Sequence, residues 1–143
     1  MCTNLQQQWT KNLGVTVTCV EMDRKTFFEQ RNACGYAMFR QGWSADYDHP
    51  QDWFDSLFVS GAPSGGSCYS NPTVDKTVAG ADATNDPSAA GDYRAAGMDL
   101  ISDSAFAGLF YGVQEYLVHP YVKGAGGNAL YDNYWTELRI LRH

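Results

Sequence analysis

The sequence lacks the motifs of common catalytic sites. It contains no G-x-S-x-G, no H-E-x-x-H and only three histidines, one of them the terminal His143, so hydrolases of these classes have no sequence support. The glycine-rich stretches at residues 65–66 and 124–127 are not followed by the Lys-Ser/Thr of a phosphate-binding loop. We therefore expect neither enzymatic activity nor a cofactor.

Cysteine pairs with the spacing of a metal or redox site are also missing. The four cysteines, Cys2, Cys19, Cys34 and Cys68, include no C-x-x-C pair, so neither a zinc knuckle nor a thioredoxin-type site is expected. Because cysteine behaves as a small hydrophobic residue, we expect buried free thiols. A disulfide stays open as the alternative, since these spacings do not predict one.

Positive charge and long apolar runs are scarce. Ten Lys and Arg stand against sixteen Asp and Glu, for a formal net charge of −6 and a pI of about 4.8. Nucleic acid and anionic membrane surfaces are therefore not expected as partners. The longest clearly apolar run, residues 106–113, is far shorter than the roughly 20 residues of a membrane span, so no membrane insertion by this segment is expected.

The 143 residues predict one domain or less. No signal peptide is present, and the chain opens almost at once on an amphipathic helix in which Leu5, Trp9 and Leu13 form one stripe. We interpret the chain as a fragment whose upstream part, with the signal peptide, is missing.

The hydrophobic pattern predicts alternating helices and strands. Helices over residues 3–13 and 24–33 alternate with β-branched or aromatic strands over residues 15–20 and 36–43. This order suggests an α/β layer with neighbouring parallel strands. Further helices are expected from Pro50, Pro72 and Pro87, since proline suits the first helical position, and further strands over residues 106–113 and 138–141.

Residues 42–50 (GWSADYDHP) are the most informative stretch. A carboxylate beside a tryptophan can hold an organic cation, with charge from Asp46 and an apolar wall from Trp43. One alternative is that Asp46 only caps the helix that starts at Pro50. Another is a metal site built from Asp46, Asp48 and His49, although three ligands in one loop are uncommon without a distant fourth.

Short motifs spread over essentially the whole chain resemble one family. They are residues 8–15 (QWTKNLGV), 42–47 (GWSADY), 69–72 with 75–76 (YSNP, DK), 93–96 (YRAA) and 117–124 (LVHPYVKG). In their order and spacing they resemble the carboxy-terminal part of the oligopeptide- and dipeptide-binding receptors of ABC importers, the extracellular solute-binding family 5.

The resemblance implies an α/β fragment of one lobe of a two-lobed, type II periplasmic-binding-protein-like fold, similar to domain 3 of a dipeptide-binding protein. Residues 1–112 would form the carboxy-terminal half of the second ligand-binding lobe, and residues 113–143 a tail that crosses back to the first lobe. From about Val113 onward, this tail is expected to be mobile, to fold back on the domain or to pair with another copy, because its partner lobe is absent.

The same resemblance implies the function of the full-length parent. It would capture peptides outside the cytoplasmic membrane, in a periplasm or as a surface lipoprotein, and deliver them to the permease subunits of an ABC transporter. The implied partners are thus the peptide ligand, the permease and the remainder of the parent chain. The fragment alone is expected to be inactive.

Asp46 matches the family's aspartate that pairs with the α-ammonium of the bound peptide. Trp43 matches a tryptophan that lines the ligand channel, with core packing as the alternative. Ser44 follows it, where many members carry cysteine, and would offer backbone hydrogen bonds.

Three further residues match ligand-contacting positions of some members. Arg31 and Arg40 match arginines near the peptide path or its carboxyl end, where a guanidinium suits a carboxylate; ion pairs away from the ligand are the alternative. Tyr111 matches a tyrosine that hydrogen-bonds the peptide backbone, with a buried core tyrosine as its alternative.

The chain also departs from the family. Arg24 stands where several members have a channel tryptophan, so side-chain preferences cannot be carried over, and Gly108 replaces a common proline. A sugar- or metal-chelate-binding receptor of the same superfamily is the alternative function. Such a receptor would not need Asp46, so an aspartate beside Trp43 favours a peptide amine as the ligand.

Overall fold

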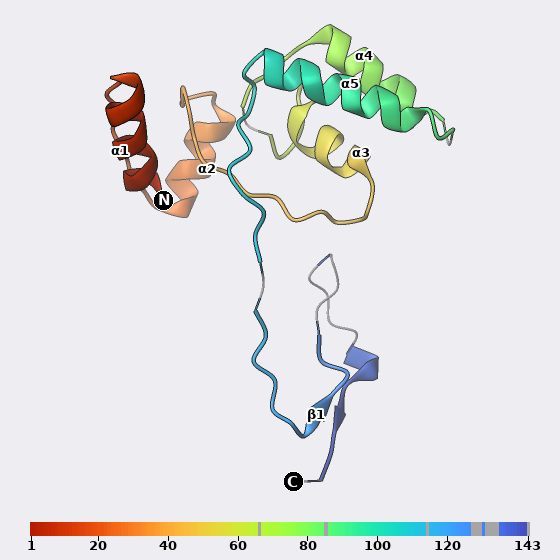
Figure 1. The fold of residues 1–143 in the computed structure, drawn as a ribbon. Helices are drawn as coiled ribbons and strands as arrows, with labels where there is room; N and C mark the ends of the chain where they lie inside the picture. Colours follow the sequence, from red (N-terminus) through yellow and green to blue (C-terminus); the bar gives the residue numbers. More distant parts are fainter. Residues whose placement is uncertain (66, 85, 114, 127–129, 131–134, 143) are drawn as a thin grey trace. The chain divides into compact units, whose positions relative to one another are not determined.

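The computed structural model describes residues 1–65, 67–84, 86–113, 115–126, 130 and 135–142. The chain divides into two compact units, residues 1–36 and residues 37–143 (Figure 1). The candidate site loop belongs to the second unit.

The first unit contains two helices, as the sequence predicts. Helix α1 (Cys2–Leu13) ends at Gly14, whose positive φ of 67° allows its N–H to donate to the Thr10 carbonyl. Helix α2 (Arg24–Asn32) starts at Asp23, whose carboxylate accepts from the Thr26 N–H at 3.0 Å. This capping, together with the Thr26 hydroxyl bond, holds the pKa of Asp23 below 3.8.

The strand predicted over residues 15–20 does not form. Two side chains of α1 satisfy backbone carbonyls that a neighbouring strand would otherwise bond. Gln6 donates to the Val17 carbonyl and Thr10 to that of Val15. The segment is thus extended without belonging to a sheet.

The expectation of free thiols is wrong. Cys2 and Cys19 form a disulfide, and Cys34 and Cys68 are also disulfide-bonded. All four cysteines lie in the described part of the chain, and none there is free. Spacing alone could not show this, because a disulfide depends on which Cα atoms the fold brings within about 7 Å; Cys2 and Cys19 are 6.0 Å apart.

The second unit is built around helices, and Figure 1 shows α4 and α5 side by side. Helix α3 (Pro50–Trp53) continues into the π-helical turn η1 (Phe54–Phe58), followed by α4 (Pro72–Asp82) and α5 (Ala89–Ser102). The predicted starts at Pro50 and Pro72 are confirmed, whereas α5 begins two residues after Pro87. The buried cluster comprises Phe54, Val74, Val78, Ala81, Ala89, Tyr93, Ala96 and Leu100.

The strands predicted over residues 36–43 and 106–113 do not form, and the described structure contains no parallel pairing of residues 15–20 with 36–43. Among the described residues the only sheet pairs β1 (Val122–Lys123) with β2 (Arg139–Ile140), and the two strands are antiparallel. Residues 106–113 are extended and mostly exposed, and Tyr111 is 97% exposed. An apolar run forms a strand only beside a partner, and the described chain places none there. Among the described residues after Val113, β1 and β2 pair with each other, and the short helix η2 (Trp135–Glu137) lies between them in the sequence.

None of the helices in the described ranges combines the length and apolar character needed to cross a lipid bilayer.

Asn71 caps α4, and removing its side chain is expected to destabilise the second unit. Its Oδ1 accepts from the Thr73 N–H at 2.9 Å and the Val74 N–H at 3.4 Å, while its Nδ2 donates to Asp103 at 2.8 Å. Asn71→Ala should lower the free energy of unfolding by about 1–2 kcal/mol in urea denaturation. Asn71→Ser, which keeps a capping oxygen, should lose less; equal losses would contradict capping as the cause.

Asp55 and Asp82 form a carboxyl pair that should make stability depend on pH. Asp55 on η1 hydrogen-bonds Asp82 at the end of α4, and the Tyr93 hydroxyl also donates to Asp82. Partial burial, then the charge of Asp82, raises the pKa of Asp55 above 3.8. The stability from the protonated pair is therefore fully present below pH 3.8 and is lost as pH rises through the folded pKa.

Asp82→Asn should weaken this pH dependence, because it removes the charge of Asp82 while the partial burial of Asp55 remains. The asparagine can still accept from Tyr93 and can donate to the Asp55 carboxylate, so no proton need be shared. Unfolding midpoints measured from pH 3.5 to 7 should differ less with pH in this variant than in the unsubstituted chain. Asp92→Asn, at an exposed position of α5, is the matched control and should leave the profile unchanged. Identical profiles for the chain and Asp82→Asn would contradict the shared proton.

Candidate functional site

The loop that precedes α3 is hydrogen-bonded to the buried carboxylate of Asp52 on that helix. The Trp43 indole N–H donates to Asp52 Oδ2 at 2.7 Å, and the Asp46 backbone N–H donates to the same oxygen at 3.3 Å. Asp52 is only 2% exposed. Trp43 and Asp46, two of the residues expected to contact a ligand, are therefore both hydrogen-bonded to one oxygen of Asp52, and Ser44 is exposed between them.

The Asp46 side chain is exposed to solvent and does not cap α3. Asp46 is exposed, and within the described ranges no side chain bonds its carboxylate. Its alternative role as helix cap is wrong, because His49 occupies the N-cap of α3 and its Nδ1 accepts from the Gln51 N–H at 3.3 Å. The Asp46 carboxylate is thus available to a cationic group from outside the chain.

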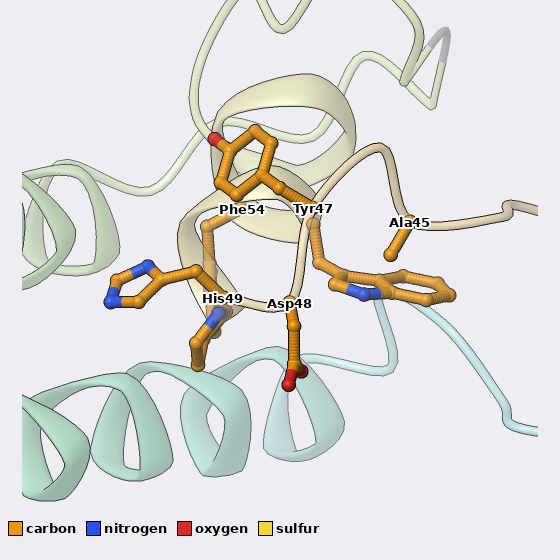
Figure 2. A pocket seen from close by; sticks show the side chains of 7 residues that line it. Ala45, Tyr47, Asp48, His49 and Phe54 are labelled. Atoms are coloured by element: carbon orange, nitrogen blue, oxygen red, sulfur yellow. The ribbon is translucent and has the colours of Figure 1, made fainter. Parts of the chain in front are cut away.

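A shallow, open pocket of about 340 Å³ adjoins this loop. It is lined by Ala45, Tyr47, Asp48, His49, Pro50, Trp53 and Phe54. Asp46 is not part of the lining although both its neighbours are, so its carboxylate does not contribute to this pocket. Figure 2 shows the Tyr47 ring and the Asp48 carboxylate pointing in opposite directions. The pocket therefore does not converge polar groups on one point.

The loop lies in a negative electrostatic environment. Partial loss of solvent raises the pKa of Tyr47 above 10.0, and the charges of four surrounding carboxylates raise it further. They belong to Asp52, Asp55, Asp82 and Asp46, in decreasing order of effect. Such a cluster favours a cation over an anion as the ligand.

The metal-site alternative is not supported by the geometry. His49 uses Nδ1 to cap α3, and its ring packs edge-on against the Tyr93 ring, with 5.4 Å between the ring centroids. Across the parts of the chain that the structure describes, no three His, Cys, Asp or Glu side chains form a group able to hold a metal ion. Asp46, Asp48 and His49 are thus close in sequence without forming a ligand set.

The remaining predicted site residues lie outside this loop. Arg31 belongs to the first unit, is 5% exposed, bonds Asn32 Oδ1 through Nε and Nη2, and stacks on Phe28 with 4.7 Å to the ring centroid. Arg40 is exposed, and Tyr111 lies in the extended segment after α5. The core alternative for Tyr111 is wrong, and ligand contacts of all three residues stay predictions.

Sequence reasoning missed Asp52. Its only local signal is an aspartate in the first turn of a helix, where carboxylates are common for reasons of the helix dipole. Nothing in the spacing from Trp43 to Asp52 predicts their hydrogen bond, because it depends on the path of the intervening loop.

Comparison with known proteins identifies relatives along nearly the whole chain. No family model matches it. The periplasmic oligopeptide-binding protein OppA of Salmonella typhimurium is 33% identical over 137 residues, which are 94% of this chain and 25% of that protein. The chain thus spans about a quarter of the length of the curated relatives it matches.

Solved structures of related proteins also match nearly the whole chain. The Escherichia coli murein tripeptide-binding protein MppA matches 99% of this chain and 28% of its own, with a TM-score of 0.80 and 27% identity. OppA of Burkholderia pseudomallei gives a TM-score of 0.79 and 26% identity over 99% of this chain and 28% of its own. The fold is therefore a piece of the two-lobed type II periplasmic-binding fold, as the motifs predict. This chain is therefore a homologue of the OppA and MppA proteins of solute-binding family 5 and matches a segment of about a quarter of their length.

Proposed function

We propose that the full-length parent of this chain is the extracytoplasmic peptide receptor of an ABC importer. The observation that carries the proposal is the similarity to OppA over 94% of the chain, combined with an exposed Asp46 carboxylate on a loop held by a buried group. The sugar- or metal-chelate alternative has no support among these relatives, whose names are those of peptide-binding proteins.

The α-ammonium of the peptide would pair with Asp46. An ammonium that leaves water for a closed cleft needs a carboxylate or other acceptors, because an unpaired buried charge is very costly. Trp43, held by Asp52, would form an apolar wall beside the amine, and the backbone at Ser44 would bond the peptide. Since backbone contacts are shared by all peptides, such a site would accept many sequences.

Closure of two lobes would bury the ligand, and binding energy would select the closed state. This segment supplies one wall of the cleft, and the facing wall and the surface for the permease belong to the remainder of the parent. Arg31, Arg40 and Tyr111 would contact the peptide farther along its path. The segment alone would bind peptide weakly or not at all.

The redox state of the cysteines fits an extracytoplasmic location. All four are disulfide-bonded in the described chain, and disulfides persist in the periplasm and outside the cell but are rare in the cytosol. The relatives are binding proteins and not enzymes, and we propose the same for the parent, which would capture its ligand unchanged.

Titration of the full-length parent with an unmodified tripeptide tests the proposal. Isothermal calorimetry should show saturable binding, and small-angle scattering should show a smaller radius of gyration with peptide than without, because the lobes close. A disaccharide and a metal chelate at the same concentrations are the controls. Binding of either control in place of the peptide would overturn the proposal.

A further inference from the structure

Asp52 is the buried group on which the proposed amine site rests. It lies on α3 with 2% of its surface exposed, among the most completely buried side chains of the described residues. A single oxygen, Oδ2, accepts from both the Trp43 indole and the Asp46 backbone N–H. The Asp52 backbone N–H donates to the His49 carbonyl at 3.2 Å, which fixes the residue within the first turn of α3.

Burial of the Asp52 carboxylate carries a large free-energy cost. Removing it from water costs several kcal/mol, to be offset by hydrogen bonds or an opposite charge. In the described chain no lysine or arginine forms an ion pair with Asp52, so its two hydrogen-bond donors carry the compensation. Both donors belong to residues expected to contact the ligand, which distinguishes Asp52 from a carboxylate that only ends a helix.

We propose that Asp52 is the positioning residue of the amine site: it holds the Trp43 ring and the Asp46 backbone in the binding geometry and adds a second negative charge beneath the loop. This inference rests on the proposed function, because it concerns the same amine site. A loop fixed before binding loses less conformational freedom when the ligand arrives, so more of the interaction energy appears as affinity.

The second charge also acts on the neighbouring Tyr47. Among the carboxylates that raise the pKa of Tyr47, Asp52 has the largest effect after loss of solvent. An ammonium beside Asp46 would be attracted by the same charge, whereas an N-acetylated peptide would gain nothing from it. The charge of Asp52 should thus strengthen binding of a free-amine peptide more than binding of the N-acetylated form.

The test measures this preference in the full-length parent. The dissociation constants of one tripeptide and its N-acetylated form are determined by calorimetry. The Kd of the N-acetylated form divided by the Kd of the free tripeptide measures the preference for a free amine, and this ratio is compared between variants. Asp52→Ala should reduce the ratio at least roughly tenfold, since position and charge are both lost. Asp52→Asn, which keeps an acceptor but not the charge, should reduce it by roughly threefold.

Asp75→Ala is the matched control. Asp75 also accepts a backbone N–H, that of Ser60 at 2.8 Å, but in the described chain no hydrogen bond joins it to the loop over residues 42–50. It should lower the unfolding midpoint and leave the ratio unchanged, as any merely structural role would. Trp43→Phe, which removes the indole donor, should lower the ratio less in the Asp52→Ala background than in the unsubstituted protein, because the two residues share one hydrogen bond.

The outcomes separate the two claims. If the unsubstituted parent prefers the free amine and the Asp52 variants keep that preference in full, the positioning role is wrong while the proposed function stands. If Asp52→Ala does not fold, an unchanged ratio in Asp52→Asn and Trp43→Phe overturns the role equally. If the unsubstituted parent binds no peptide, the proposed function fails and the role of Asp52 fails with it.

Discussion

Asp46→Asn in the full-length parent is expected to weaken binding of a free-amine peptide by about 1.5–3 kcal/mol, or roughly ten- to 150-fold. Asparagine keeps the size of the side chain and one acceptor oxygen but loses the charge that pairs with the ammonium. The Asp46 backbone bond to Asp52 is unaffected by the substitution, so the loop should keep its geometry. Calorimetric titration with one tripeptide measures the effect.

Two controls separate a specific ion pair from general electrostatics. The N-acetylated tripeptide should bind the parent and the Asp46→Asn variant equally weakly, because it has no ammonium. Asp48→Asn makes the same change at another exposed position of the same loop and should alter affinity by no more than about twofold, as expected for a screened surface charge. A similar loss in both variants, or an unchanged affinity in Asp46→Asn, would refute the anchoring role.

Leu100→Ala is expected to lower the free energy of unfolding of the 143-residue chain by about 3 kcal/mol. Leu100 lies on α5, is 1% exposed, and belongs to the cluster that α5 shares with α4. The substitution removes apolar contacts and leaves a cavity between two helices whose other contacts hold them in place, so relaxation should recover little. Urea denaturation followed by circular dichroism at 222 nm measures the loss.

Met98→Ala on the same helix is the control for this prediction. Met98 is 60% exposed, and methionine and alanine are both good helix formers, so the loss should stay below about 0.5 kcal/mol. Equal effects at the two positions, or a loss below about 1 kcal/mol for Leu100→Ala, would show that the α4–α5 cluster does not dominate the stability of the chain.

The helices could be predicted from the sequence because their signals are local. The positions of Leu5, Trp9 and Leu13 lie within α1, and Gly14 ends it where the sequence indicates. Pro72 starts α4 as predicted, and the buried residues of α5, Ala89, Tyr93, Ala96 and Leu100, recur at helical spacing in the sequence. Each of these signals acts within about two turns of chain.

The strands and disulfides could not be predicted in the same way. The β-branched run over residues 15–20 and the apolar run over residues 106–113 carry strand composition, yet neither lies in a sheet. A strand is stabilised by a neighbour that can be far away in the sequence, and composition does not say whether that neighbour is present. The Cys2–Cys19 disulfide likewise requires the turn after α1 to return the chain to its start.

The proposed amine site likewise has features that the sequence predicts and features that depend on the tertiary structure. The order of Trp43, Ser44 and Asp46 within a family motif, and hence the expected ligand chemistry, is a property of the sequence alone. The tertiary structure decided that His49 and not Asp46 caps α3, and that Asp52 holds the loop. The order of residues in a motif is fixed by the covalent chain and does not depend on conformation. The buried hydrogen bond between Trp43 and Asp52, in contrast, forms only when the loop packs against α3 and excludes water.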